Sequence, residues 1–131
     1  MAVTTGAEIT GLVVGDNMDV IRTITGIPSG QVLTDGWLTI KENPDDPDED
    51  AIIQKHITTD YVAGEGQITD DGETDQEGEA IFELTAANTA LFQAGYRYHY
   101  DIQFKTDADK IGTLEIGTIT PLQQITETDG S

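Results

Sequence analysis

Acidic side chains are the residues of this chain with the most evident capacity to bind something. Six acids fall within nine residues, from Glu42 to Asp50, in the segment KENPDDPDEDAIIQK. Carboxylates at alternate positions, as at Asp46 and Asp48, begin the calcium-binding loop of an EF-hand. The segment is therefore a candidate metal site, a candidate protein-binding surface, or a solvated connection between two strands.

The spacing around these acids does not complete a calcium loop. An EF-hand needs glycine at its sixth position and a bidentate glutamate at its twelfth. Counted from Asp46, these positions hold Ala51 and Ile57, and a second candidate that starts at Asp71 also fails at both. We therefore predict no metal site and no cofactor. The two prolines in 42–50 remove backbone donors, so we expect a solvated loop that cannot continue a sheet.

Trp37 is the second residue that points to binding. In GWLTIKE the apolar residues Leu38 and Ile40 alternate, which places Trp37 on the opposite face of a strand. Tryptophan is enriched among the residues that dominate protein–protein binding energies, so an outward Trp37 is a candidate contact residue. The alternative is that Trp37 folds over the end of the domain and completes its core. The candidate interface residues are Trp37, Asp45, Asp46, Asp48, Glu49 and Asp50.

Residues suited to catalysis are scarce. The chain has no cysteine, and its two histidines, His56 and His99, lie in strand-like segments on polar faces. Its serines are Ser29, in a Pro-Ser-Gly turn, and the final Ser131. A serine nucleophile needs a base within hydrogen-bond reach, and no spacing here indicates one. We predict that the protein is not an enzyme.

Composition narrows the classes of partner. The chain has 131 residues and a formal net charge of -19, from 25 acids and 6 bases. A polyanion of this strength repels nucleic acid and anionic membranes, so we expect neither as a partner. No apolar stretch approaches the roughly 20 residues that span a bilayer. The first residues lack a basic segment followed by an apolar run, so we expect no signal peptide.

The segments that carry these candidate residues have the pattern of β-strands. The segment 96–105, YRYHYDIQFK, alternates strictly with period two. Weaker alternation recurs in MDVIRTIT, where Arg22 falls among the inward residues and needs a partner. In IGTLEIGTIT the apolar parity passes through Leu114 and Ile116 and then shifts, which predicts a β-bulge at Gly117. The predicted inward residues of 96–105 are Tyr96, Tyr98, Tyr100, Ile102 and Phe104.

One short helical turn interrupts the strands. Thr85 is suited to be its N-cap and Gly95 lies where a C-terminal glycine belongs, so we predict a turn near residues 86–92. Seven or eight short strands separated by turn signals predict an all-β sandwich. We expect a single domain, 1–131, with a core of about 8–121 and a polar tail, 122–131.

The order of these landmarks resembles a known group of proteins. A Gly-Asp step at residues 15–16 opens a strand, and IPSGQVLTDGWLTIKEN leads into the acidic loop. AIFELTAANTALFQAGYRYHYDIQF then gives a strand, a helical turn and an alternating strand, and TLEIGTITPLQQIT is the last strand. Over about residues 10–126 this is similar to the small immunoglobulin-like β-sandwich proteins of tailed bacteriophages, which include the N-terminal domain of baseplate upper proteins.

This resemblance implies a fold and a role. The fold is an immunoglobulin-like antiparallel β-sandwich, and the role is that of a non-catalytic virion structural protein. It would decorate the capsid or act as an adaptor at the neck, tail or baseplate, after assembly in the cytoplasm of the host bacterium. Its partners would be other virion subunits, in several symmetric copies. The alternative is a carbohydrate- or calcium-binding β-sandwich module of a secreted bacterial protein.

Overall fold

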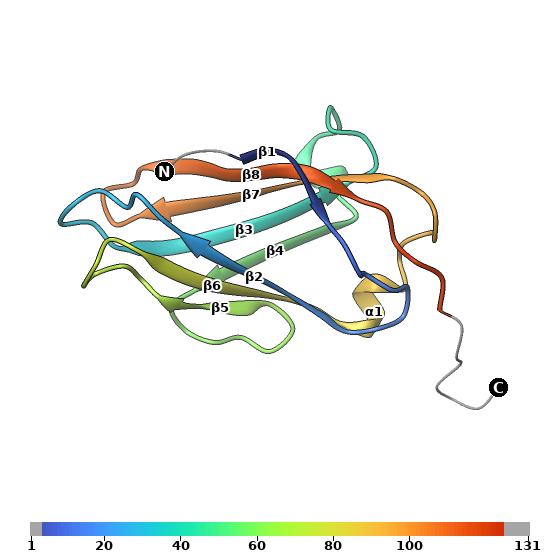
Figure 1. Ribbon diagram of the computed structural model, residues 1–131, viewed down its shortest axis with the longest axis horizontal. Helices are drawn as coiled ribbons and strands as arrows, with labels where there is room; N and C mark the ends of the chain where they lie inside the picture. The colour runs from blue at the N-terminus through green and yellow to red at the C-terminus, as the bar shows by residue number, and fades with distance from the viewer. Residues whose placement is uncertain (1–3, 125–131) are drawn as a thin grey trace.

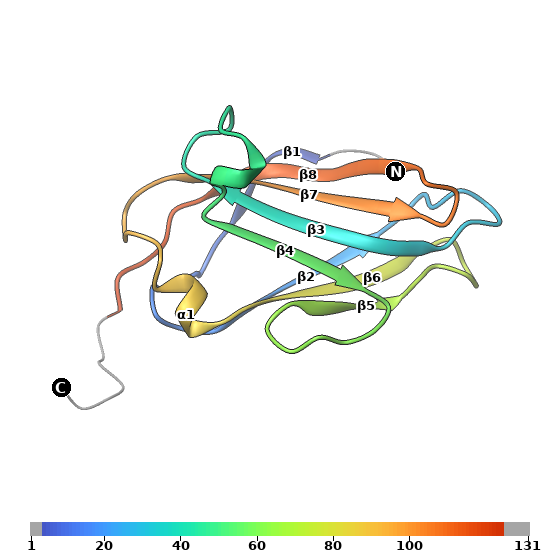
Figure 2. The ribbon, with the colours of Figure 1, turned by 180° about the vertical axis from the view of Figure 1, so that it is seen from behind.

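Two β-sheets packed face to face make up the computed structural model, in which residues 4–124 are described (Figures 1 and 2). A single α-helix of four residues, α1, follows the sixth strand, and within the described range no helix has the length to cross a membrane. The elements are β1 (Thr4–Ile9), β2 (Met18–Ile24), β3 (Leu33–Lys41), the 3-10 turn η1 (Asp48–Asp50), β4 (Ile53–Thr58), β5 (Gly66–Asp70), β6 (Gly78–Leu84), α1 (Ala86–Thr89), β7 (Tyr98–Thr106) and β8 (Ile111–Ile119).

The strand order is that of an immunoglobulin-like sandwich. One sheet has the order β1-β8-β7-β3-β4 and the other β2-β6-β5. In immunoglobulin lettering this sets strands B, E and D against G, F, C and C′. The predicted all-β, immunoglobulin-like sandwich is therefore confirmed. One pairing departs from the antiparallel expectation, because β1 runs parallel to β8.

The core follows the predicted alternation, with one correction at its start. Every second residue of β7, from Tyr98 through Phe104, is buried. Tyr96, predicted to share this face, lies before the strand and is 48% exposed. Its amide bonds to the Gln93 carbonyl at 3.2 Å in the turn that follows α1, so the extended backbone starts only at Tyr98. Across the sandwich, the rings of Phe82 and Phe104 lie 6.2 Å apart between centroids.

The predicted bulge of the last strand lies elsewhere than expected. Along β7 the pairing moves from Glu115 to Thr113, so Leu114 is the extra residue. Glu115 and Gly117 consequently face inward and Ile116 faces outward, which makes the predicted inward position of Ile116 wrong. Gly117 has a separate reason to be glycine, because a Cβ there would collide with the carbonyl of Ala7 on β1. Close approach of the parallel strand requires that missing side chain.

The predicted helical turn is confirmed, with its cap. The Thr85 hydroxyl accepts from the Asn88 amide at 3.1 Å, and the Asn88 side chain accepts from the Thr85 amide at 2.9 Å. This reciprocal pair is a capping box.

Of the predicted tail, residues 122–124 belong to the fold: Leu122 bridges to Val13 in a parallel pairing. Residues 125–131 lie outside the described part.

An ion pair bridges the two sheets along one side of the sandwich, where β2 of the small sheet faces β8 of the large one. We call each side along which the two sheets meet a lateral seam. Arg22 donates from Nε to Glu115 Oε1 at 2.9 Å and from Nη2 to Oε2 at 3.0 Å. The Tyr100 hydroxyl of β7 donates to the same carboxylate. The inward Arg22 thus has the partner that the sequence required, and a bidentate pair fixes its orientation.

A lysine closes the opposite seam, where β4 lies beside β5. Lys55 points inward between Ile53 and Ile57 and is only 5% exposed. Its ammonium donates to the Gly64 carbonyl at 2.6 Å and lies 3.3 Å from Glu65 Oε2, just before β5. Each seam is therefore closed by a base on one sheet and acceptors on or beside the other.

Replacing Glu115 should destabilise the fold in a pH-dependent way. Burial raises the pKa of Glu115, but hydrogen bonds from Arg22 and Tyr100 outweigh it and hold the pKa below its usual value of 4.5. The stability from this ionised group is present above the pKa of the unfolded chain and is lost as the pH falls through the lower folded pKa. At pH 7 we expect Glu115→Gln to cost about 2 kcal/mol, less than the ~3–5 kcal/mol of a fully buried pair, because Arg22 is partly exposed.

Chemical denaturation of the wild type and Glu115→Gln at neutral pH and below the usual carboxylate range measures this difference. The gap between the two proteins should shrink in acid. Glu8→Gln, at an exposed carboxylate on β1, is the control and should change little at either pH. A gap of equal size at both pH values would contradict a role for the ionised carboxylate.

Candidate functional site

The outward surface of the five-stranded sheet is the candidate site. We call it the outer face and define it as the outward side chains of β3, β4, β7 and β8, together with Asp48 of the acidic loop. Trp37 lies near its centre, paired with His56 on β4 and Gln103 on β7. Trp37 therefore points outward, as the alternation predicted, and its alternative place in the core is wrong. Its role as a contact residue remains a prediction.

Neighbouring side chains hold Trp37 in place. Its ring stacks on His56 with centroids 5.2 Å apart and planes within 8°. His56 Nε2 lies 2.7 Å from Asp35 Oδ2, and Lys105 Nζ lies 3.6 Å from the other carboxylate oxygen. Burial raises the pKa of Asp35, but the His56 hydrogen bond and the Lys105 charge hold it below its usual value. A tryptophan fixed before binding loses little side-chain freedom when a partner arrives.

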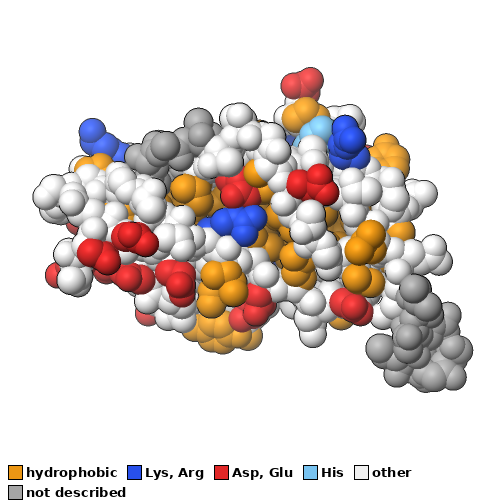
Figure 3. Space-filling view, in the orientation of Figure 1, with side chains coloured by type: hydrophobic (Ala, Val, Ile, Leu, Met, Phe, Trp, Pro, Cys, Tyr) orange, Lys and Arg blue, Asp and Glu red, His pale blue; other side chains and the backbone are white. Residues whose placement is uncertain are grey.

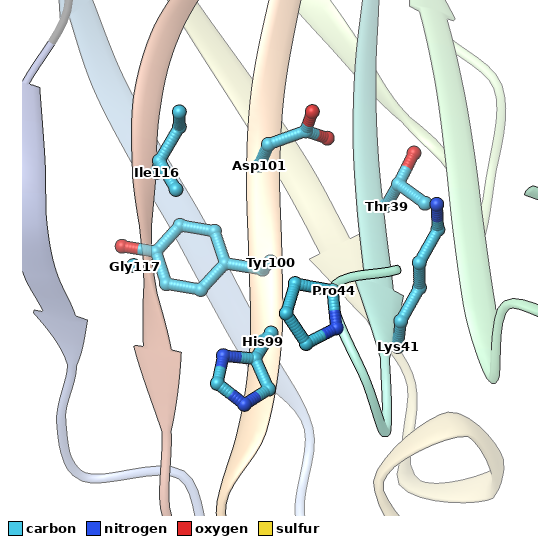
Figure 4. Close-up of a pocket in the computed structure, with 8 residues that line it drawn as sticks. All are labelled: Thr39, Lys41, Pro44, His99, Tyr100, Asp101, Ile116 and Gly117. Atoms are coloured by element: carbon cyan, nitrogen blue, oxygen red, sulfur yellow. The ribbon is translucent and has the colours of Figure 1, made fainter. Parts of the chain in front are cut away.

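Two shallow hollows flank Asp101 on this face. One, of about 250 Å³, is drawn in Figure 4 and the other, of about 190 Å³, adjoins Trp37. Thr39 and Asp101 line both. The first hollow is lined by Thr39, Lys41, Pro44, His99, Tyr100, Asp101, Ile116 and Gly117, and the second by Trp37, Thr39, Asp48, Gln54, Asp101, Gln103 and Ile111.

The Asp101 carboxylate has no direct partner within residues 4–124. It is partly buried, and neither a hydrogen bond nor an ion pair reaches it there. Burial raises its pKa above the usual value, a change that the charge of Lys41 opposes and that of Asp48 increases. A partly buried carboxylate in this state gains free energy from any donor that a partner brings.

The acidic loop projects from the end of β3 and β4 and is anchored by one lysine (Figure 1). Lys41 Nζ donates to the Asp46 carbonyl at 2.7 Å and lies 2.8 Å from Asp48 Oδ1. The anchor brings Asp48 to the hollow beside Trp37. The other predicted interface acids lie on the loop without lining either hollow, and all but the partly buried Asp46 are exposed: Asp45, Asp46, Glu49 and Asp50.

The remaining polar candidates do not assemble a reactive group. His56 and His99 both lie on the outer face, as expected, and in the described range neither bonds to a serine. Ser29 is exposed in its turn, and Ser131 lies outside the described residues. Over residues 4–124 there is also no group of three or more His, Asp or Glu side chains placed to hold a metal ion.

No family model matches the chain, and no curated protein matches it significantly in sequence. The class that geometry defines is an immunoglobulin-like β-sandwich with a candidate binding face on its larger sheet. The sequence identified Trp37 and Asp48 on that face. It does not identify Asp101 or Ile111, and it predicts Ile116 to face inward. The polar parity of 96–105 is the signal that indicates Asp101.

Trp37→Ala should leave the domain folded. Because the ring lies on the outer face, we expect a loss of about 1–2 kcal/mol in the free energy of unfolding, against ~3–5 kcal/mol for removing a core aromatic residue. Chemical denaturation distinguishes the two. Phe104→Ala, in the fully buried core, serves as the control and should show the larger loss. An equal loss of unfolding free energy in both variants would mean that Trp37 stabilises the fold as much as a core aromatic residue does.

Calcium should bind weakly to the isolated chain. Lys41 already neutralises Asp48, and the other loop acids, all exposed except the partly buried Asp46, do not converge on a common centre. At physiological ionic strength, isothermal titration with calcium should give no saturable site tighter than about 100 μM, well short of the sensor range. A stoichiometric site that disappears when Asp46, Asp48 and Asp50 become Asn would overturn this expectation.

Proposed function

We propose that this protein is a non-catalytic structural component of a bacteriophage particle and that it binds neighbouring subunits through the outer face. Its place would be on the capsid, as a decoration, or at the neck, tail or baseplate, as an adaptor. The observation that carries the proposal is the composition of that face: a fixed Trp37, two exposed isoleucines and an Asp101 carboxylate without a direct partner in residues 4–124.

Support for binding comes from how such interfaces work. Aromatic anchors at the centre of a contact, surrounded by side chains that exclude water, supply most of the affinity. Trp37 occupies that central position, and Ile111 and Ile116 lie on β8, two strands away, with 63% and 46% of their surface exposed. A stiff sheet also presents these groups without reorganisation, which limits the entropic cost of association.

Support for the virion role comes from the resemblance in sequence together with the immunoglobulin-like strand order. The charge fits a structural role as well, because a chain of net charge -19 is repelled by packaged nucleic acid. It would therefore occupy the outside of a particle, in contact with protein.

Carbohydrate binding is the second candidate, and one observation favours it. The hollow beside Trp37 combines an aromatic ring with the amides of Gln54 and Gln103 and the carboxylate of Asp101. Apolar contact with a few placed polar groups is the general composition of a small-ligand site. The same residues would serve either partner, so the test must separate them.

Mass spectrometry of density-purified particles should detect the chain at the abundance of a structural protein. Trp37→Ala, introduced into the phage genome, should lower its incorporation, because losing a tryptophan anchor typically costs ~2 kcal/mol or more of binding. Tyr61→Ala is the matched control, since Tyr61 is 57% exposed on the β4–β5 connection, away from the outer face.

Detection of the chain only in the lysate, and never in purified particles, would refute the virion proposal. If the chain then bound a glycan array and lost that binding in Trp37→Ala, the second candidate would replace it.

A further inference from the structure

We propose that the outer face binds the outer face of a second copy of this chain, forming a two-fold symmetric dimer. The inference rests on the proposed function, because it names the neighbour that this face contacts. Three features of the face carry it: its charge, the register of its strands and its size.

Charge is the first feature, because two chains of net charge -19 repel each other almost everywhere. On the outer face, however, three acids are balanced by Lys41 and Lys105, which leaves a formal charge of about -1. The acids are Asp35, Asp48 and Asp101. The other acids of the loop lie at one end of this face and Asp109, which pairs with Lys105, at the other, so two copies that approach through its strands meet less repulsion than elsewhere on the chain.

The opposite sheet shows the contrast. The outward side chains of β2 and β6 include Asp19, Glu79 and Glu83 around Ile21, and no base lies among them. Acidic side chains are also spread over the connection from β5 to β6, as Figure 3 shows at that end of the molecule. This sheet is thus a poor surface for self-association.

Strand register is the second feature, because it makes the face complementary to itself. Residues aligned across the strands form three neighbouring rows. The central row is His56–Trp37–Gln103–Thr113; on one side lies Gln54–Thr39–Asp101–Ile116, and on the other Thr58–Asp35–Lys105–Ile111.

A two-fold axis lying in the interface along the central row exchanges the two outer rows. It sets Asp101 of one copy opposite Lys105 of the other, and the reverse. The same operation sets Ile116 opposite Ile111 and brings the two Trp37 rings together. One symmetric contact thereby accounts for the Asp101 carboxylate, both exposed isoleucines and the fixed aromatic ring.

Size is the third feature and sets the expected affinity. Three nine-residue strands and the six-residue β4, about 4.8 Å apart and with a rise of about 3.4 Å per residue, cover roughly 540 Å² per copy. Standard interfaces bury about 800 Å² per partner, so this one falls at the weak end. We expect a dissociation constant in the micromolar range.

Sedimentation velocity of the full chain tests the dimer, from about 1 μM to about 1 mM, a span that brackets the expected constant. The dimer fraction should rise with concentration, and with added salt, because salt screens the repulsion between the two polyanions. Ile116→Asp should weaken association at least tenfold. Ile21→Asp, which adds the same charge at a similarly exposed isoleucine on the opposite sheet, should weaken it far less.

A second pair of variants separates the specific contact from net charge. Asp101→Lys and Asp19→Lys make the same change in net charge, and both reduce the general repulsion. Asp101→Lys should nevertheless weaken the dimer, because it faces Lys105, whereas Asp19→Lys should strengthen it slightly. Unfolding curves confirm that each variant is folded, and Ile111→Asp replaces Ile116→Asp if the latter is not.

Two results would overturn the inference: a monomer at every concentration, or a dimer that Ile21→Asp disrupts and Asp101→Lys does not. Each is distinct from failure of the virion role. A chain that is monomeric yet abundant in particles refutes only the dimer. A dimer that never enters particles refutes only the virion role.

Discussion

Closing the two lateral seams of the sandwich is the constraint on which the rest of this structure depends. The chain has no cysteine, so no disulfide can join its sheets. Arg22 and Lys55 join the sheets instead, at opposite seams. Each points inward from an alternating strand toward acceptors on or beside the other sheet. Charges inside a core are costly unless every polar atom is paired. Within residues 4–124 no buried side-chain nitrogen or oxygen lacks a partner.

The bulge at Leu114 links this internal pairing to the outer face. The extra residue turns Glu115 inward, where it meets Arg22, and leaves Ile111 and Ile116 on the outside. Without it, Glu115 would share the parity of Thr113 and point outward, and Arg22 would have no carboxylate. One added residue thus supplies both a core ion pair and the apolar part of the candidate binding face.

Much of the fold could be predicted from the sequence, and the failures have physical causes. The alternation in β7 and the cap at Thr85 are local signals, and the structure confirms both. The shift in apolar parity after Ile116 predicts a bulge at Gly117, but Ile116 lies on the outer face and the extra residue is Leu114. Gly117 is needed instead for the approach of β1, a contact between distant segments. The position of Tyr96 depends on where the turn after α1 ends, which alternation does not encode.

Only the part of the candidate site that depends on local signals could be predicted from the sequence. The alternation of Leu38 and Ile40 is enough to place Trp37 on the outward side of its strand. The neighbours that fix it, and the row that includes Asp101, depend on which strands are adjacent. Asp48 reaches the hollow beside Trp37 only because Lys41 anchors the loop, and a contact of that kind has no sequence pattern of its own.

The parallel pairing of β1 with β8 has a mechanical consequence. Thr4 pairs with Glu115 at one end and Ile9 with Ile119 at the other, so the first and last strands point the same way. Tension applied between Thr4 and Ile119 would pull these strands past each other and load the whole ladder at once. Antiparallel end strands would instead open one bond at a time. A force applied along the chain between these two ends would therefore load the β1–β8 pairing in shear.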